Sequence, residues 1–318
     1  MTHHIIIPPI TLHSGEILTN VTVHVQTWGS LNVDRNNVAI VLHALTGTTN
    51  AVEWWPQIVG PGKVINTDKH FVVCPRIHYE GLTMSPLPDI TAHDVVAMYR
   101  YAADAIGIDR IQIVIGGSLG GQHAIEWAIQ EPARFDSVVA VAANAIHSPW
   151  GIAFNAAQRM AIEADATFNT NVDGAGEAGL AAARAIGMIS YRTYDDFAIK
   201  QSPRNGMDYP ADSYQRYQGQ KLTKRFSPQT YYLLTKIMDS HNVGRHRGGL
   251  KAALSQIIAN TIIVGIDSDI LFPTREQHFL VDHIHNATYL EMHSTVGHDA
   301  FLADQLSLAT LLTSTLAH

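Results

Sequence analysis

A glycine-rich turn between a strand and a helix constrains this chain more than any other feature of its sequence. Residues 111–127 read IQIVIGGSLGGQHAIEW, in which a short apolar strand runs into Gly-Gly-Ser-Leu-Gly-Gly and then into a helix-forming segment. The residues GGSLG at 116–120 fit G-x-S-x-G, the pattern of a nucleophile elbow, which exposes a serine at a strained strand-to-helix turn. Glycine suits this turn because side chains there would collide with the adjoining strand and helix.

Two other interpretations of this turn remain open from the residues alone. Ser118 could cap the following helix, or the glycines could surround a phosphate group. The phosphate interpretation is the weaker one, because neither the P-loop pattern G-x-x-x-x-G-K-S/T nor the dinucleotide-binding pattern G-x-G-x-x-G fits these residues. The position after a predicted strand and before a predicted helix favours the nucleophile elbow.

Strand-like and helix-like segments alternate around this turn. Residues 20–28 alternate apolar and polar side chains as an edge strand does, and residues 1–16 contain a first strand. Helical spacing of apolar residues covers 91–108 and 122–131. Further strands are predicted within the apolar runs 37–47, 70–77, 111–115, 136–144, 260–273 and 286–301, and a helix ends the chain. This order predicts an α/β fold with a mostly parallel central sheet and helices on both faces.

The pattern changes between residues 150 and 249, where about a hundred residues read as helices separated by polar loops. The simplest interpretation is one α/β core, formed by 1–149 and 250–318, that is interrupted by an inserted helical lid at 150–249. A chain of 318 residues is long enough for such a domain with one insertion.

Composition excludes several classes of protein. The net charge of −7 argues against a nucleic-acid partner, which would require a basic face. No run of about 18 apolar residues appears, so we expect no membrane span. The N-terminal segment lacks the basic region and the cleavage site of a signal peptide, and the single cysteine, Cys74, suits a reducing compartment; we therefore expect a cytoplasmic protein. No spacing of cysteines or histidines predicts a metal site.

A serine nucleophile needs a base and an acid that orients the base, and on this fold they follow the serine in that order: serine, acid, histidine. The acid is expected after the strand at 260–266, where Asp267 and Asp269 both qualify. The base is expected after the last strand, where His298 stands, although His43 could also line the pocket. Main-chain N–H groups stabilise the oxyanion in such enzymes, and Leu119 and Leu45 are the residues expected to supply them.

Several longer stretches together resemble the homoserine O-acetyltransferase family of α/β-hydrolase-fold acyltransferases. The match extends through the helical insertion and nearly the whole chain. The stretches are VLHALTG (41–47), IGGSLGGQHAIEWA (115–128), SPWGIAFNAAQRMAI (148–162), GLAAARAIGMISYRT (179–193), YQGQKLTKRF (217–226), YYLLTKIMDSHNVGRHRGG (231–249), SDILFP (268–273) and GHDAFL (297–302).

The resemblance implies a role for each of several residues. Ser118 would carry the acyl group, His298 would be the base, and the S-D-x-L-F/Y-P motif selects Asp269 as the acid. Arg159 would face the pocket and hold the carboxylate of the amino-acid substrate, and Asp299 would lie near its ammonium group. The family implies acetyl-CoA as co-substrate, no bound cofactor, L-homoserine as acceptor in methionine biosynthesis, and a homodimer that forms through the lid.

The chain also departs from the family's pattern. The segment that follows Cys74, CPRIHYEGLTMSPLPDITAHDVV, is shortened and lacks the usual Gly/Ser-rich loop. Gln122 and His123 replace Met-Gln after the elbow, and Asn242 replaces an aspartate. Three functions therefore stay open beside acetyl transfer to homoserine: an esterase or thioesterase with the same triad, a transferase that acts on serine, and a transferase that uses succinyl-CoA.

Overall fold

The computed structural model describes residues 1–82, 87–203 and 209–316. Its centre is a sheet of eight strands in the order β1-β4-β8-β5-β9-β10-β11-β12. Pairing is antiparallel for β1 with β4 and for β4 with β8, and parallel for every later pair. The strands are β1 (Thr2–Ile7), β4 (Val21–Trp28), β5 (Val38–Leu42), β8 (Phe71–Ile77), β9 (Ile111–Gly117), β10 (Phe135–Val141), β11 (Asn260–Ile266) and β12 (Ala287–Met292).

The prediction of a mostly parallel sheet is confirmed, but one strand was misplaced within it. The alternating segment at 20–28 is not an edge strand, because β1 pairs with β4 along its whole length, from Thr2 opposite Gln26 to Ile7 opposite Val21. The edge strand is therefore β1. Two short pairs lie outside the main sheet: β2 (Ile10–Thr11) with β3 (Ile17–Leu18), and β6 (Val59–Gly60) with β7 (Ile65–Asn66).

Helices cover both faces of the sheet, as predicted. Alternate residues of β5 enter different cores: Ile40 and Leu42 pack in one cluster, and Ala39 and Val41 in the other. This alternation is what a strand buried on both faces requires. The first face carries α2 (Ala92–Ala105), α3 (Leu119–Gln130), α9 (Leu250–Leu254) and α10 (Thr274–His283), and the second carries α1 (Ala51–Trp54), α11 (Ala300–Ala303) and α12 (Gln305–Leu316). Two short 3₁₀ helices cover Tyr79–Leu82 and Pro132–Arg134.

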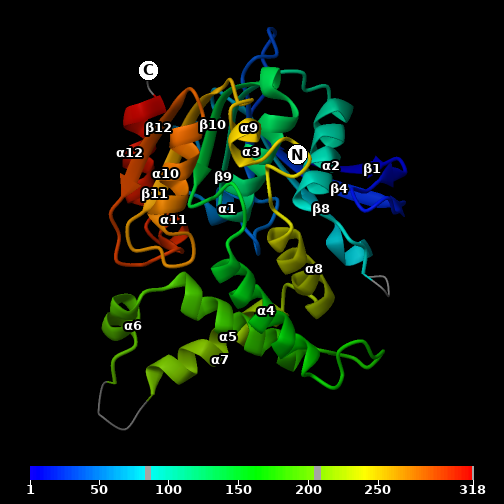
Figure 1. Ribbon diagram of the computed structural model, residues 1–318, viewed down its shortest axis with the longest axis vertical. Coiled ribbons are helices and arrows are strands. Elements are labelled where there is room, and N and C mark those ends of the chain that lie inside the picture. Colours follow the sequence, from blue (N-terminus) through cyan, green and yellow to red (C-terminus); the bar gives the residue numbers. More distant parts are fainter. Residues whose placement is uncertain (83–86, 204–208, 317–318) are drawn as a thin grey trace.

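The helical insertion is formed by the five helices that follow β10 and precede α9 in the described part of the chain. They are α4 (Pro149–Glu163), α5 (Glu177–Tyr191), α6 (Tyr194–Lys200), α7 (Pro210–Thr223) and α8 (Pro228–Asp239). Both α4 and α8 begin with a serine cap followed by proline; Ser148 accepts from the Gly151 N–H, and Ser227 from the Thr230 N–H. These helices gather at one end of the molecule (Figure 1).

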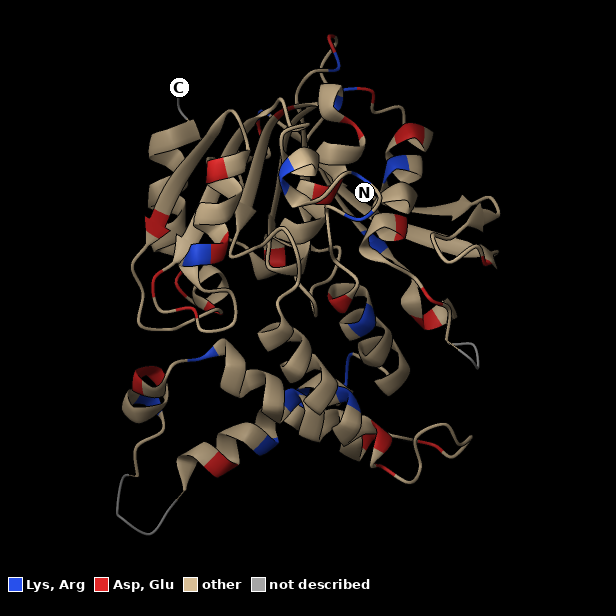
Figure 2. Ribbon diagram, in the orientation of Figure 1, with Lys and Arg blue, Asp and Glu red and all other residues tan. Residues whose placement is uncertain are grey.

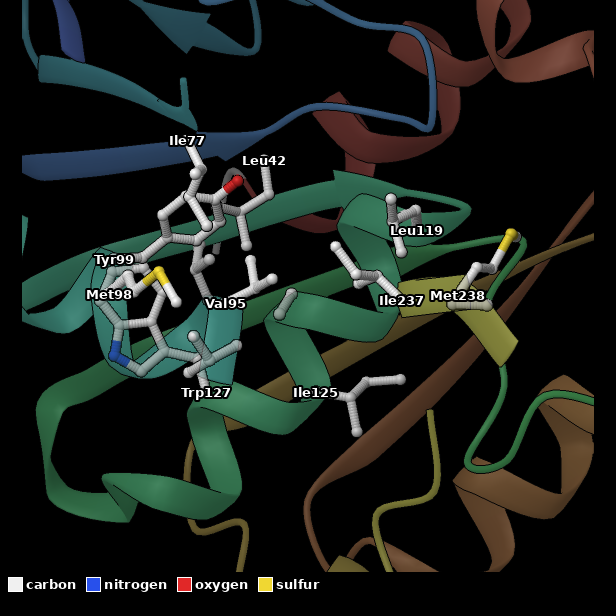
Figure 3. Packing of buried hydrophobic residues seen from close by; sticks show 14 of the residues in the cluster. Leu42, Ile77, Val95, Met98, Tyr99, Leu119, Ile125, Trp127, Ile237 and Met238 are labelled. Carbon is white, nitrogen blue, oxygen red and sulfur yellow. The ribbon is translucent and has the colours of Figure 1, made fainter. Parts of the chain in front are cut away.

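Helix α8 connects the insertion to the core at a point that matters for the site. Figure 3 shows Ile237 and Met238 of α8 beside Leu119, the first residue of α3. All three side chains are buried. The insertion therefore packs directly on the turn that holds Ser118.

Candidate active site

Ser118 lies at a sharp turn between β9 and α3, with φ of 55° and ψ of −122°. Positive φ is unfavourable for a serine, and such strain persists only where the surroundings hold the backbone in place. A Cβ atom on Gly116 would lie 2.3 Å from the carbonyl carbon of Gly120, and one on Gly120 would lie 2.2 Å from the Leu42 carbonyl oxygen. Because these obstacles are main-chain atoms, both positions require glycine.

The structure brings Ser118, His298 and Asp269 together in a hydrogen-bonded chain. His298 Nε2 lies 2.8 Å from Ser118 Oγ, and His298 Nδ1 lies 2.6 Å from Asp269 Oδ2. Asp269 follows β11 and His298 follows β12, and the carboxyl ends of these neighbouring parallel strands meet at one edge of the sheet. All three residues are buried. This geometry is that of a nucleophile, a base and an acid that orients the base.

Main-chain donors fix the orientation of the Asp269 carboxylate. Its Oδ1 atom accepts hydrogen bonds from the N–H groups of Leu271 at 2.8 Å and Phe272 at 2.9 Å. Oδ2 is thereby left facing His298. Burial lowers the pKa of His298, but the charge of Asp269 and its hydrogen bond raise it by more, so the net pKa lies above the ordinary value. The ring of Phe272 stacks on the imidazole, with centroids 4.9 Å apart.

The other candidate acid, Asp267, points away from this chain of residues. Its carboxylate binds the exposed side chain of His293 at 2.9 Å and the Ser294 N–H at 3.1 Å. Between the two aspartates, Ser268 Oγ accepts a hydrogen bond from the Gly297 N–H at 3.1 Å. That bond ties the loop that carries the acid to the loop that carries the base.

Two main-chain N–H groups near Ser118 have no partner in the described part of the chain. Leu119 is the first residue of α3, so its N–H has no intrahelical acceptor, and no other acceptor is present for it or for the Leu45 N–H. Leu45 also lines the cavity beside Ser118. His43, by contrast, does not line the cavity, because its ring turns to the Ala44 carbonyl and to Tyr99.

A cavity opens above Ser118 and His298, between the sheet edge and the insertion. Its walls include Phe154, Gln158 and Tyr191 of the insertion as well as Leu45 and Thr46 of the core. None of the described residues in the altered segment after Cys74 lines it, and residues 83–86 of that segment lie outside the described residues. Cys74 itself is buried, and burial raises the pKa of its thiol, which fits a structural role.

Arg159 does not line this cavity. Its guanidinium binds Asp239 of α8 at 2.7 Å and Thr235 at 3.1 Å. The cavity-lining residue on the same face of α4 is Asn155, one turn earlier, so Arg159 lies about 6 Å further along the helix axis. The carboxylate of Asp239 therefore binds the guanidinium that the family resemblance assigned to the carboxylate of the substrate.

A different arginine, Arg184 of α5, lines the cavity instead. Its guanidinium carbon lies 5.5 Å from the centroid of the Tyr191 ring, and it forms no ion pair with any described carboxylate. Asp299 lines the same cavity, and Arg192 Nε lies 3.2 Å from its Oδ2. The sequence did carry a signal for Arg184, because it is the single cation in the otherwise apolar helical run GLAAARAIGMISY.

Gln122, which departs from the family's pattern after the elbow, belongs to a buried polar layer behind the cavity. Gln122 Nε2 donates to Asn144 Oδ1 at 2.9 Å and lies 3.4 Å from Nδ1 of His147, which lines the cavity. Burial lowers the pKa of His147, and also that of His123, to about 3. Both imidazoles are therefore neutral at pH 7. Asn242 lies elsewhere, in a loop, where its Oδ1 accepts from the Gly244 N–H.

Within 1–82, 87–203 and 209–316, no group of three or more His, Cys, Asp or Glu side chains is arranged to hold a metal ion. No helix among those residues combines the length and the apolar surface needed to cross a lipid bilayer.

Comparison with known proteins agrees with this geometry. Residues 38–305 match the family model described as alpha/beta hydrolase fold. The chain is 40% identical to the homoserine O-acetyltransferase of Cyclobacterium marinum, covering 96% of this chain and 92% of that protein. The crystal structure of homoserine O-acetyltransferase from Bacillus anthracis superposes with a TM-score of 0.91 at 21% identity, covering 100% of this chain and 98% of that one.

An enzyme of another activity shares the same architecture. The acetylester hydrolase from Corynebacterium glutamicum superposes with a TM-score of 0.87 at 21% identity, covering 99% of this chain and 95% of that one. At this identity the two crystal structures show the fold alone, so the family is decided by the curated relative. Taken with the full-length match to that relative, the fold and the Ser118 elbow place the chain in the homoserine O-acetyltransferase family, within the α/β-hydrolase fold.

Proposed function

We propose that this protein transfers an acetyl group from acetyl-CoA to the hydroxyl of L-homoserine through an acyl-Ser118 intermediate. The observation that carries the proposal is the hydrogen-bonded chain Ser118–His298–Asp269, which opens into a cavity lined by one arginine and one aspartate. The 40% identity to a homoserine O-acetyltransferase supports the choice of donor and acceptor.

In the first half of the reaction, His298 Nε2 takes the proton of Ser118 as Oγ attacks the thioester carbonyl. The carbonyl electrons move onto oxygen, and the N–H groups of Leu45 and Leu119 stabilise the oxyanion. As the intermediate collapses, the C–S bond breaks and the sulfur leaves with the proton from His298. The products are free CoA and acetyl-Ser118. Asp269 keeps the imidazole in the tautomer that carries its proton on Nδ1 and stabilises the imidazolium.

In the second half, the homoserine hydroxyl loses its proton to His298 and attacks the acetyl-Ser118 carbonyl. The tetrahedral intermediate collapses with loss of Ser118 Oγ, which recovers a proton from His298. O-acetylhomoserine leaves and the free enzyme returns. Two half-reactions through one covalent intermediate produce ping-pong kinetics.

Homoserine is a zwitterion, so its binding requires one cation and one anion at fixed positions. We assign Arg184 to the carboxylate, because a guanidinium offers a planar pair of donors and this one has no described carboxylate partner. We assign Asp299 to the ammonium group, since Arg192 contacts only its Oδ2 atom. Arg159, the earlier candidate for the carboxylate, is engaged by Asp239.

The helical insertion at 150–249 is proposed to act as a lid over the α/β core formed by 1–149 and 250–318. A transferase must prevent water from taking the acetyl group, and burial of the site favours a bound hydroxyl over solvent. The burial of Ser118 and His298, only 3% exposed each, supports this assignment.

A homodimer through the lid is also proposed. Several large apolar side chains of the insertion are exposed, among them Met160, Ile189, Tyr194, Ile199 and Tyr209. Exposed apolar groups of this kind gather at subunit contacts. Light scattering coupled to gel filtration distinguishes the dimer of about 70 kDa, twice the 34.8 kDa chain, from the monomer.

The deciding experiment measures free CoA released from acetyl-CoA by the wild type and by Ser118→Ala, each with and without L-homoserine. Release that depends on homoserine and disappears in the variant supports the transferase. Release that is independent of homoserine refutes it in favour of a thioesterase. A higher kcat/KM with L-serine than with L-homoserine would make serine the acceptor. A higher kcat/KM with succinyl-CoA than with acetyl-CoA would make succinyl-CoA the donor.

A further inference from the structure

Arg225 is a cation beside the active-site cavity for which the proposed chemistry has no use. It follows the end of α7, and its side chain is exposed. Its one hydrogen bond to a described residue runs from a terminal nitrogen to the Thr46 carbonyl oxygen, at 3.5 Å. A guanidinium has five N–H donors, and 3.5 Å lies at the outer limit for such a bond. Nearly all of its hydrogen-bonding capacity therefore has no partner among the described residues.

The contact between Arg225 and Thr46 shows where Arg225 lies relative to the cavity. Thr46 lines the cavity next to Leu45, whose N–H is assigned to the oxyanion. Because the Arg225 guanidinium reaches the Thr46 carbonyl while remaining exposed, it stands on the solvent side of the cavity wall. We call this place the cavity mouth, defined by Thr46 and Arg225.

The charges around the mouth are mainly positive. Arg225 forms no ion pair with a described carboxylate, and its pKa is lowered first by partial burial and then by the neighbouring charge of Arg184. Among the described residues, Glu53 opposes this effect, and Arg76, which is itself paired with Glu80, adds to it. Lys and Arg segments are visible where the helices of the insertion cross (Figure 2). A site with unpaired cations and little opposing charge attracts anions.

We propose that Arg225 binds a phosphate group of the acyl donor at the cavity mouth. This inference rests on the proposed function in one respect, that the donor is a CoA thioester. The thioester end has to reach Ser118 inside the cavity, whereas phosphates carry full charges whose desolvation is costly. They therefore stay at the mouth, where an exposed guanidinium with free donors offers paired, charge-assisted hydrogen bonds.

Arg225 thereby makes the enzyme prefer CoA thioesters over other acyl donors, a preference that the catalytic residues cannot produce. Ser118, His298 and Asp269 act on any activated acyl group. A phosphate contact outside the cavity adds affinity for CoA esters and none for simple esters, so it raises the specificity for the donor without touching the reacting atoms.

The test compares two ligands that share the thiol arm, CoA and pantetheine, of which only CoA carries phosphates and an adenosine. Isothermal titration calorimetry measures their Kd values for the wild type, Arg225→Ala, Arg225→Lys and Arg216→Ala. Arg216 is the matched control, because it is an exposed arginine of α7 paired with Asp212. Thermal melting of each variant checks that it is folded.

We expect Arg225→Ala to weaken the binding of CoA about tenfold, which corresponds to about 1.4 kcal/mol of binding free energy. The Kd for pantetheine should stay unchanged. Arg225→Lys recovers part of the loss, and Arg216→Ala behaves as the wild type. The KM for acetyl-CoA follows the same order, and added salt reduces the difference between wild type and Arg225→Ala.

Two results overturn the inference: unchanged binding of CoA to Arg225→Ala, or equal weakening of the binding of CoA and of pantetheine. The outcome is separable from that of the proposed function because CoA binding needs neither homoserine nor turnover. If the protein binds CoA through Arg225 yet does not acetylate homoserine, this inference holds and homoserine is refuted as the acceptor. A protein that acetylates homoserine with an unchanged KM for acetyl-CoA in Arg225→Ala refutes this inference alone.

Discussion

Replacing Asp269 with asparagine should stop catalysis by reversing the tautomer of His298. Oδ1 of Asp269 accepts from the N–H groups of Leu271 and Phe272, so the amide oxygen of the asparagine is held on that side. The amide NH₂ group then faces His298 Nδ1, where Oδ2 stood at 2.6 Å. Nδ1 must become an acceptor, which moves the ring proton to Nε2. A protonated Nε2 facing Ser118 cannot take the serine proton.

The expected loss in kcat is about 10⁴-fold, the value known for the same substitution in a serine-protease triad, and it corresponds to about 5 kcal/mol of barrier. The pH dependence should change as well. Activity requires neutral His298, so the wild-type kcat/KM rises with pH to a plateau, with its midpoint above the ordinary value of 6.5. Burial lowers the pKa of His298, and Asp269 is the main group that raises it. Removing that charge shifts the residual activity's midpoint to lower pH.

The assay is homoserine-dependent CoA release between pH 5 and 9. The matched control is Asp267→Asn, which changes the same chemical group two residues away, where the side chain binds exposed His293. We expect this control to keep wild-type kcat. Asp269→Asn within tenfold of wild-type kcat, or with an unchanged pH midpoint, would refute the tautomer argument.

Three further predictions concern other parts of the chain. Arg184→Ala should raise the KM for homoserine at least tenfold while leaving acetylation of the enzyme intact. Arg159→Ala should lower the Tm without changing that KM. A raised KM in Arg159→Ala and an unchanged KM in Arg184→Ala would reverse the assignment of the substrate carboxylate to Arg184. Gly120→Ala should destabilise the fold by about 3 kcal/mol in urea unfolding, because the new Cβ would lie 2.2 Å from the Leu42 carbonyl oxygen; wild-type stability would contradict the steric argument. Burial raises the pKa of Glu126, but its hydrogen bonds lower it by more, to about 2. Ionised Glu126 should therefore contribute about 3 kcal/mol to the free energy of unfolding above pH 4.5, and this contribution is lost as the pH falls toward 2. A difference in unfolding free energy between wild type and Glu126→Gln that stays constant from pH 7 to pH 3 would disprove this.

The parts of the site that depend on the strand-to-helix turn were predictable from the sequence. Gly116, Ser118 and Gly120 fall at fixed spacing in one short segment, and the steric demand that selects them acts between atoms close in the chain or on the neighbouring strand. The order of strands and helices around the turn then predicted that an acid and a histidine would follow the last two strands. Asp269 and His298 meet there because parallel neighbours end at the same edge.

The choices among similar residues depended on tertiary structure. Asp267 and Asp269 both follow β11. The loop directs Asp267 to solvent and Asp269 to His298, and this difference identifies the acid. Arg159 and Arg184 both lie on helices of the insertion, and the position of Asp239 on α8 decides which guanidinium is already paired.

The sequence by itself therefore determined the fold class, the helical insertion, the Ser118 elbow and the place of His298 after the last strand, because local periodicity and a steric turn specify them. Only the tertiary structure decided that β1 pairs with β4, that Arg184 rather than Arg159 lines the cavity, and that Arg225 stands at its mouth without an ion-pair partner among the described residues. The physical reason is that pairing of strands and pairing of charges are contacts between distant segments, which no pattern along one segment encodes.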